Sequence, residues 1–304
     1  MEFTAPEVKR LRDLHFDPAL FRPWKTGKPI DHLMSRKGGL MPGTVTVLAG
    51  GPGVGKTSVG LDILVCLVRN YPELPVVYMT GEMTESDMYE EAEYYPALLD
   101  VPTLYLNRWV DKGLDKALEA SFNKGYAVVL MDSFSDIAEK TAEEKGWPVK
   151  RAEIWLLNAI LQTAETQNTC FLVIQQFTKS GEFVGSNKLK HNTTGFVYFL
   201  RDKIGKPFLM FDKNRRNGRM VQKPLYFSKS KTTGEIEYDW TRFERDRHVF
   251  ETSEDEHKRL LEEAAAFEAL FKAENDLPLP PAENSDGEKE TATEKQGADA
   301  PKNA

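Results

Sequence analysis

The sequence predicts an α/β fold whose central sheet is mainly parallel and is extended by antiparallel strands. One motif and one change of pattern carry this prediction. Up to residue 176, short apolar runs alternate with helical patterns, which is the order of βαβ units with parallel strands. A glycine-rich octapeptide joins the first of these runs to a helix. Beyond residue 176, apolar runs follow one another across turns without helices between them, as in an antiparallel sheet.

The first core strand is expected at 45–49 and the helix after it at 56–70, where Val59, Ile63 and Leu67 share one face. The rest of the parallel part comprises strands at 76–80, 103–106, 127–131 and 169–175, and helices at 84–93, 113–124 and 152–166. The antiparallel strands are expected at 195–201, 206–211 and 223–227. Before the core, residues 7–14 have the pattern of a short helix.

The chain divides into four parts. Residues 1–27 are an N-terminal assembly or linker segment, and 28–250 are the α/β core. Ser253 and Glu256 form a capping box before apolar residues at helical spacing, so 251–273 are expected to be an amphipathic C-terminal helix. Residues 274–304 contain eight acids and three lysines, which predicts a disordered acidic tail. Such a tail either competes with an anionic ligand for a basic site or only aids solubility.

The composition is that of a cytoplasmic globular protein. Of 304 residues, 40% are hydrophobic and 29% charged, and no apolar stretch is long enough to span a membrane. The N-terminus is charged where a signal peptide would be apolar. Cys66 and Cys170 lie within apolar patterns, as buried thiols do, and the five histidines lack metal-ligand spacing.

The octapeptide 50–57, GGPGVGKT, is a complete phosphate-binding loop of the form GxxxxGK[ST]. Its glycines allow the backbone to turn N–H groups toward the phosphates of a nucleotide, at the positive end of the next helix. Lys56 would bind the β- and γ-phosphates, and Thr57 would hold Mg²⁺ through its hydroxyl. The residues expected to contact the nucleotide are Gly50, Gly51, Pro52, Gly53, Val54, Gly55, Lys56, Thr57 and Ser58.

Polar side chains follow three other apolar runs. Asp132 comes after 127–131, where a carboxylate can hold the water shell of Mg²⁺. Glu82 comes after 76–80 and is the candidate general base for an attacking water; the alternative is an exposed glutamate near a helix cap. Gln176 follows Gln175 at the end of 169–175, where its amide could sense the γ-phosphate.

A basic block lies inside this acidic chain. Residues 179–231 contain thirteen lysines and arginines and three acids, an excess of ten positive charges, whereas the whole chain carries −7. This contrast indicates a site for a polyanion. The alternative is a solvated surface whose lysines serve only solubility.

Four stretches resemble the RecA-type ATPases, and most closely their bacterial RadA/Sms branch: 50–57, TGEMTESDM at 80–88, VVLMDS at 128–133, and FTKSGEFVGSNKLKHNTTGFVYF at 177–199. The segment 212–218 is similar to that branch's K-N-R-F-G motif, although Arg216 and Asn217 replace its aromatic residue and glycine. The resemblance covers about residues 28–240. It implies a RecA core, a homo-oligomeric ring or filament with ATP at subunit boundaries, and DNA in a channel or groove.

The resemblance also implies roles for the basic block. Residues 179–194 match the family's mobile DNA-binding loop, in which Lys179, Lys188 and Lys190 would contact phosphates and Phe183 and His191 would stack on bases. Lys213 and Arg215 match residues that complete a neighbour's ATP site; the alternative is that they belong to the DNA-binding patch. Near the N-terminus, 16–19 resembles the F-x-x-A segment by which related recombinases dock onto a neighbour, although Phe16 could instead pack on its own domain.

The predicted function is that of a DNA-dependent ATPase that remodels single-stranded or branched DNA in recombination, repair or replication. Two alternatives share the phosphate loop: a ring-forming replicative helicase motor, and a KaiC-like ATP-dependent signalling or scaffold protein without nucleic acid. The RadA zinc module and protease-like domain are not recognised in this sequence, and Gln176 stands where RadA proteins have histidine. A divergent, minimal, phage-type relative is therefore expected.

Overall fold

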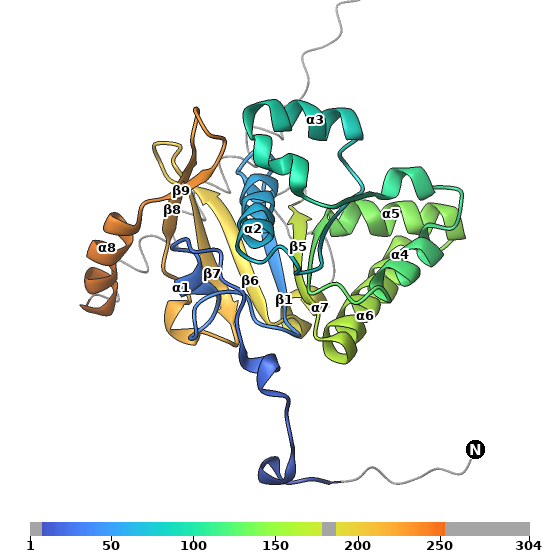
Figure 1. Ribbon diagram of the computed structural model, residues 1–304, viewed down its shortest axis with the longest axis horizontal. Coiled ribbons are helices and arrows are strands. Elements are labelled where there is room, and N and C mark those ends of the chain that lie inside the picture. The colour runs from blue at the N-terminus through green and yellow to red at the C-terminus, as the bar shows by residue number, and fades with distance from the viewer. Residues whose placement is uncertain (1–7, 178–186, 253–304) are drawn as a thin grey trace, which may run out of the picture.

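The computed structural model describes residues 8–177 and 187–252, which form a sheet of nine strands (Figure 1). The strands are β1 (Val45–Gly50), β2 (Val76–Thr80), β3 (Thr103–Tyr105), β4 (Val128–Asp132), β5 (Cys170–Gln176), β6 (Gly195–Arg201), β7 (Pro207–Asn214), β8 (Leu225–Lys229) and β9 (Ile236–Tyr238). Their order in the sheet is β3-β2-β4-β5-β1-β6-β7-β8-β9. The strands from β3 to β6 in this order pair in parallel, and β7, β8 and β9 continue the sheet in antiparallel fashion. The predicted α/β sheet with its antiparallel extension is confirmed.

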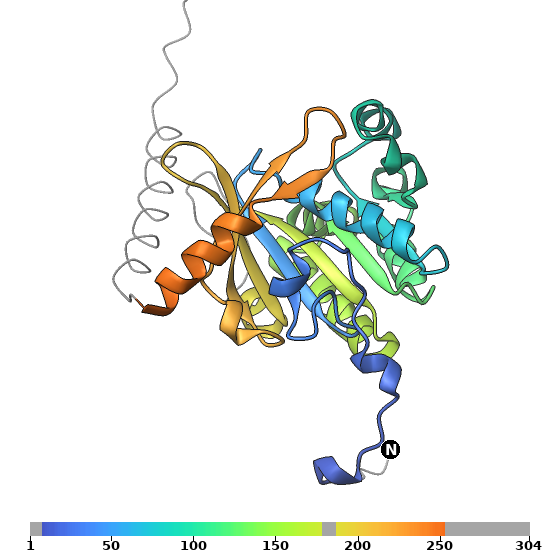
Figure 2. The same cartoon turned by 60° about the vertical axis from the view of Figure 1, so that its left-hand side comes forward.

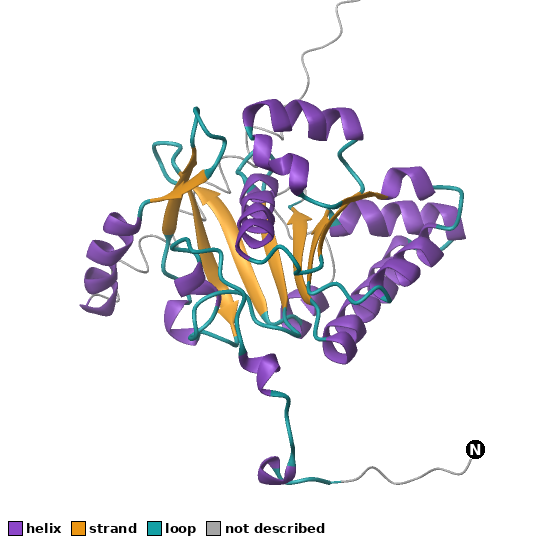
Figure 3. Ribbon diagram, in the orientation of Figure 1, coloured by secondary structure: helices purple, strands orange, loops and turns teal. Residues whose placement is uncertain are grey.

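Helices cover both faces of the sheet (Figure 3). They are α1 (Asp31–Met34), α2 (Lys56–Asn70), α3 (Glu85–Tyr94), α4 (Leu114–Phe122), α5 (Phe134–Lys145), α6 (Val149–Gln167), α7 (Asn187–Asn192) and α8 (Trp240–Thr252). The view in Figure 2 places α2 on one face, and α4, α5 and α6 on the other. The helices predicted at 56–70, 84–93, 113–124 and 152–166 correspond to α2, α3, α4 and α6.

The central strands are buried on both sides, as expected for a parallel sheet between two helical layers. Alternate residues of each strand face opposite layers. In β4, Leu130 packs in the apolar cluster around α2, whereas Val129 and Met131 pack in the cluster formed with α4, α5 and α6. All three side chains are fully or almost fully buried. The sheet therefore holds the ends of its strands in fixed positions.

The prediction of a short helix at 7–14 is wrong for the part of that segment that the structure describes. The chain forms 3₁₀ turns at Leu11–Asp13 and Pro18–Phe21 instead, and it runs away from the sheet (Figure 1). Val8 is 97% exposed and Leu11 is 77% exposed. Without burial of an apolar face, so short a helix is not stable in water.

Among the described helices and strands, α1, α5, α7, α8 and β9 were not predicted. The apolar face of α5 includes small or polar residues such as Ala138 and Thr141, so its helical period is weak in the sequence, although Ser133 caps it by accepting a hydrogen bond from the Asp136 N–H. The C-terminal helix expected at 251–273 lies outside the described residues beyond Thr252, where α8 ends. The tail expected at 274–304 lies outside them as well.

Candidate active site

The predicted phosphate loop connects the end of β1 to the start of α2. Gly53 and Gly55 have φ angles of +68° and +97°, which only glycine adopts without strain. A Cβ atom on Gly50 would lie 2.5 Å from the carbonyl oxygen of Phe199 on β6, so a larger residue would displace the loop. The loop therefore depends on its glycines for its conformation, and it ends at the N-terminus of α2, where a helix favours anions.

Lys56 points back into this loop. Its Nζ donates hydrogen bonds to the carbonyl oxygens of Gly50 at 2.9 Å and Gly51 at 2.6 Å, and the side chain is 6% exposed. Burial lowers the pKa of Lys56 to about 8, although the charges of Asp132 and Glu82 act in the opposite direction. A buried ammonium held only by neutral carbonyl groups is well suited to bind a phosphate.

Thr57 and Asp132 form a hydroxyl–carboxylate pair next to Lys56. The Thr57 hydroxyl donates to Asp132 Oδ2 at 2.7 Å, and the Tyr78 hydroxyl donates to the same oxygen at 3.1 Å. Burial raises the pKa of Asp132 to about 6; the negative charge of Glu82 adds to this, while the Thr57 and Tyr78 hydroxyls oppose it. Two oxygen ligands of this kind beside a phosphate loop fit Mg²⁺, which is bound by few protein oxygens together with phosphates.

Glu82 and Gln176 meet across the sheet. The Gln176 amide donates to Glu82 Oε1 at 2.9 Å. Glu82 is not the cap of α3, because that cap is Thr84, which exchanges hydrogen bonds with Asp87 in a capping box. The turn that carries Glu82 is held by its neighbours: the Gly81 N–H donates to the Asp132 carbonyl oxygen at 2.8 Å, and Lys140 Nζ donates to the Gly81 carbonyl oxygen at 2.5 Å.

Lys213 and Arg215 lie at the other end of the sheet. Because β7 runs antiparallel to β6, Asn214 pairs with Gly195, which is the partner of Thr46 near the start of β1. Lys213 Nζ donates to the carbonyl oxygens of Lys190 and His191 at 2.7 Å, and Arg215 donates to that of His191 at 3.0 Å. These cations cap the end of α7 and do not meet the phosphate loop of their own chain.

Of the predicted DNA-binding residues, Lys188, Lys190 and His191 belong to α7, whereas Lys179 and Phe183 lie outside the described residues. Lys190 pairs with Asp212 at 2.6 Å and lies against the rings of Phe196 and Tyr198. Lys188 and His191 are exposed. The basic block thus reaches the surface at the end of the sheet where Lys213 and Arg215 lie.

The sequence analysis missed two basic residues next to the predicted site, Lys140 and Arg201. Lys140 lies on the unpredicted α5, and no local motif marks it. Arg201 ends β6 and donates a hydrogen bond to the Gly53 carbonyl oxygen at 2.8 Å. The pairing of β6 with β1 would have revealed that Arg201 lies beside the loop, but 148 residues separate Arg201 from Gly53 in the sequence.

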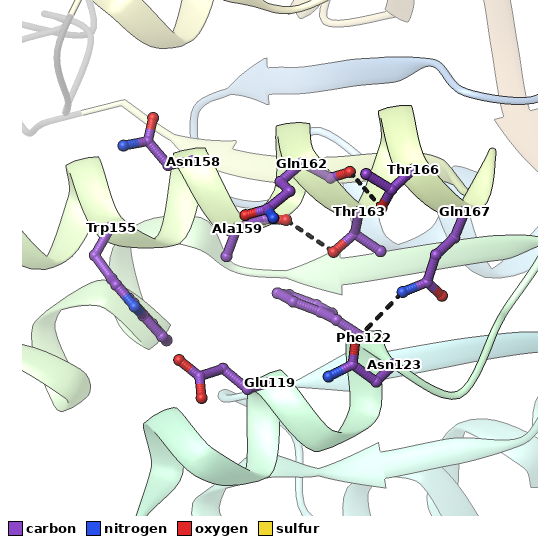
Figure 4. Close-up of a pocket in the computed structure, with 10 residues that line it drawn as sticks. All are labelled: Glu119, Phe122, Asn123, Trp155, Asn158, Ala159, Gln162, Thr163, Thr166 and Gln167. Atoms are coloured by element: carbon purple, nitrogen blue, oxygen red, sulfur yellow. Dashed lines mark hydrogen bonds between the residues drawn. The ribbon is translucent and has the colours of Figure 1, made fainter. Parts of the chain in front are cut away.

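A separate hollow of about 350 Å³ lies between α4 and α6 (Figure 4). It is lined by polar side chains such as Asn123, Asn158 and Gln162 around Phe122 and Trp155. It contains none of the predicted site residues.

Within the described parts of the chain, no helix is long and apolar enough to cross a membrane.

The phosphate loop, the mainly parallel sheet and the polar residues at its edge define a RecA-type fold. A solved structure, the KaiC-like protein PH0186 from Pyrococcus horikoshii, shares this fold with a TM-score of 0.53 and 18% sequence identity, over 71% of this chain and 98% of that one. A search against protein-family models found no match.

The sequence is similar to proteins named DNA repair protein RadA. The one from Campylobacter jejuni is 26% identical over 166 residues, which are 54% of this chain and 35% of the relative. Those from Mycobacterium tuberculosis and Pseudomonas aeruginosa are 27% and 24% identical over 60% and 66% of this chain, or 37% and 42% of the relatives. The chain thus spans less than half the length of these relatives. The chain therefore has a RecA-type fold, and its sequence is distantly similar to that of RadA proteins.

Proposed function

We propose that this chain hydrolyses ATP with Mg²⁺ and uses the reaction to remodel single-stranded or branched DNA in recombination, repair or replication. The observation that carries the proposal is the meeting of five side chains at the end of the sheet where the phosphate loop lies: Lys56, Thr57, Glu82, Asp132 and Gln176. They provide a cation, two oxygen ligands for a metal, a carboxylate and an amide, which are the groups that phosphoryl transfer to water requires.

Lys56 has a direct role in binding the nucleotide. On arrival of ATP, its Nζ would exchange two neutral carbonyl acceptors for anionic phosphate oxygens, with which its hydrogen bonds are stronger. The N–H groups at the start of α2 would bind the same phosphates. Mg²⁺, when bound by Thr57 and Asp132, would supply positive charge that stabilises the transferred phosphoryl group.

Glu82 would act as the general base. Its carboxylate is exposed, and the turn that carries it is fixed by Asp132 and Lys140 through Gly81. It would accept a proton from the water that attacks the γ-phosphate. Gln176, hydrogen-bonded to Glu82, would then register the presence of the γ-phosphate at the end of β5, directly before the segment that leads to α7.

In a homo-oligomer, residues at the other end of the sheet would act on a neighbouring subunit. Lys213 and Arg215 lie away from their own phosphate loop, so they would complete the ATP site of a neighbouring subunit. Lys188, Lys190 and His191 of the adjacent α7, with Lys179 and Phe183, would contact DNA. The relatives named DNA repair protein RadA support DNA as the partner.

Turnover of ATP with Mg²⁺, measured with and without single-stranded DNA, tests this function. We expect hydrolysis that requires Mg²⁺ and is stimulated by DNA. ATP turnover together with an absence of salt-dependent DNA binding would favour the KaiC-like alternative, and strand displacement on a forked duplex would favour the helicase motor. A chain that binds no ATP would refute all three functions.

A further inference from the structure

Arg201 links the phosphate loop to the hairpin between β6 and β7. One guanidinium nitrogen donates to the carbonyl oxygen of Gly53 in the loop at 2.8 Å, and the other terminal nitrogen donates to the carbonyl oxygen of Gly205 in the hairpin at 2.8 Å. The side chain is half-buried. It therefore bridges two backbone segments that are far apart in the sequence.

The hairpin is a firm support for this contact. Asp202 Oδ1 accepts hydrogen bonds from the N–H groups of Ile204 at 3.1 Å and Lys206 at 2.8 Å, and the Asp202 carbonyl oxygen accepts one from Gly205 at 2.8 Å. The register of β6 with β1 pairs Phe199 with Gly50, so Arg201 falls two residues further on, beside the loop. The position of Arg201 is thus set by backbone hydrogen bonds on both sides.

The Gly53–Val54 peptide is the part of the loop that this contact controls. In a trans peptide the carbonyl and the N–H point in opposite directions. When the Gly53 carbonyl is held outward by Arg201, the Val54 N–H must point away from Arg201. Gly53 lacks a Cβ and already has a positive φ, so nothing in its own side chain prevents this peptide from rotating.

We propose that Arg201 is a positioning residue for nucleotide binding: it fixes the Gly53–Val54 peptide so that the loop presents its N–H groups to the phosphates without rearrangement. This inference rests on the proposed binding of ATP by the loop. Fixing the loop before binding removes the free-energy cost of ordering it in the complex. Arg201 therefore raises affinity for both ATP and ADP, because the loop binds phosphates that the two nucleotides share.

Four variants of the full chain test the inference by equilibrium binding of fluorescent ATP and ADP analogues. Arg201→Met removes the hydrogen bonds, Arg201→Lys keeps a charged donor, Arg201→Gln keeps a neutral donor, and Lys206→Met removes one charge from the same hairpin. Loss of a charge-assisted hydrogen bond should weaken binding of both nucleotides about tenfold in Arg201→Met. Lys206→Met should bind as the wild type does, and Arg201→Lys and Arg201→Gln should each recover part of the affinity.

A second readout separates positioning from catalysis and from folding. Arg201→Met should raise the KM for ATP while kcat at saturating ATP stays close to that of the wild type, and its Tm should be unchanged. Equal affinity in Arg201→Met and the wild type would overturn the inference and leave the proposed function intact. A wild-type chain that binds neither nucleotide would refute the proposed function itself.

Discussion

The substitution Asp132→Asn should stabilise the protein while it abolishes ATP hydrolysis. Asp132 is 2% exposed, and burial raises its pKa to about 6, whereas its value in an unfolded chain is 3.8. Between these two values the folded state binds more protons than the unfolded state, so stability falls as the pH rises from about 4 to about 6. This difference corresponds to about 3 kcal/mol at neutral pH.

Asparagine keeps an oxygen that can accept the Thr57 hydrogen bond but carries no charge. Without nucleotide or Mg²⁺, we therefore expect the variant to be more stable than the wild type by about 3 kcal/mol near pH 7.5, and the difference to vanish below about pH 4. Urea unfolding across this pH range measures it. Asp136→Asn is the matched control: Asp136 is a neighbouring carboxylate that pairs with Lys140 at 2.8 Å, so its removal should bring no such gain.

Two results would contradict this reasoning. One is an Asp132→Asn protein that is less stable than the wild type near neutral pH, and the other is a gain that does not change with pH. Mg²⁺ and ATP provide a further check, because a ligand that binds only the folded state stabilises it in proportion to its affinity. With both present, the wild type should recover the difference and the variant should not.

The remaining predictions concern turnover, DNA and assembly. Lys56→Ala should impair nucleotide binding and turnover, whereas Glu82→Gln should keep binding and lose hydrolysis by about 10²–10⁴-fold in steady-state assays; a wild-type rate in Glu82→Gln would exclude it as the base. Replacing Lys179, Lys188 and Lys190 by alanine should flatten the dependence of log K on log salt by roughly 0.7 per lost contact with single-stranded DNA, and an unchanged slope would remove them from the interface. Mixing Lys56→Ala with Arg215→Ala subunits should restore turnover that neither has alone; activity equal to the sum of the two would exclude Arg215 as a residue acting across the subunit boundary.

The meeting of the predicted site residues could be anticipated because the ends of the strands can be read from the sequence. β1, β2, β4 and β5 are all parallel, so their carboxyl ends lie at the same edge of the sheet, and the polar residues that follow them meet there. This rule anticipates the contact of Thr57 with Asp132 and that of Gln176 with Glu82. The rule does not depend on how many residues separate these positions in the sequence.

The same rule could not find Arg201 or place Lys213. Both depend on β6 pairing with the free side of β1 and on β7 reversing the chain direction. Alternation of apolar residues shows that a strand exists but not which strand it joins. The pairing sends Arg201 to the phosphate loop and Lys213, twelve residues later, to the opposite end of the sheet. Charge alone would have assigned both to one basic surface.

Without a bound ligand, the buried charges of Lys56 and Asp132 lower the stability of the folded state. Burial lowers the pKa of Lys56 to about 8 and raises that of Asp132 to about 6, so both charged forms are disfavoured despite their mutual attraction. For Lys56 the unfolded state binds more protons between about pH 8 and 10.5, so stability rises with pH in that range. A phosphate offers Lys56 an anion, and Mg²⁺ offers Asp132 a cation. A magnesium nucleotide would therefore offset both unfavourable charges at once, whereas either component alone would offset only one.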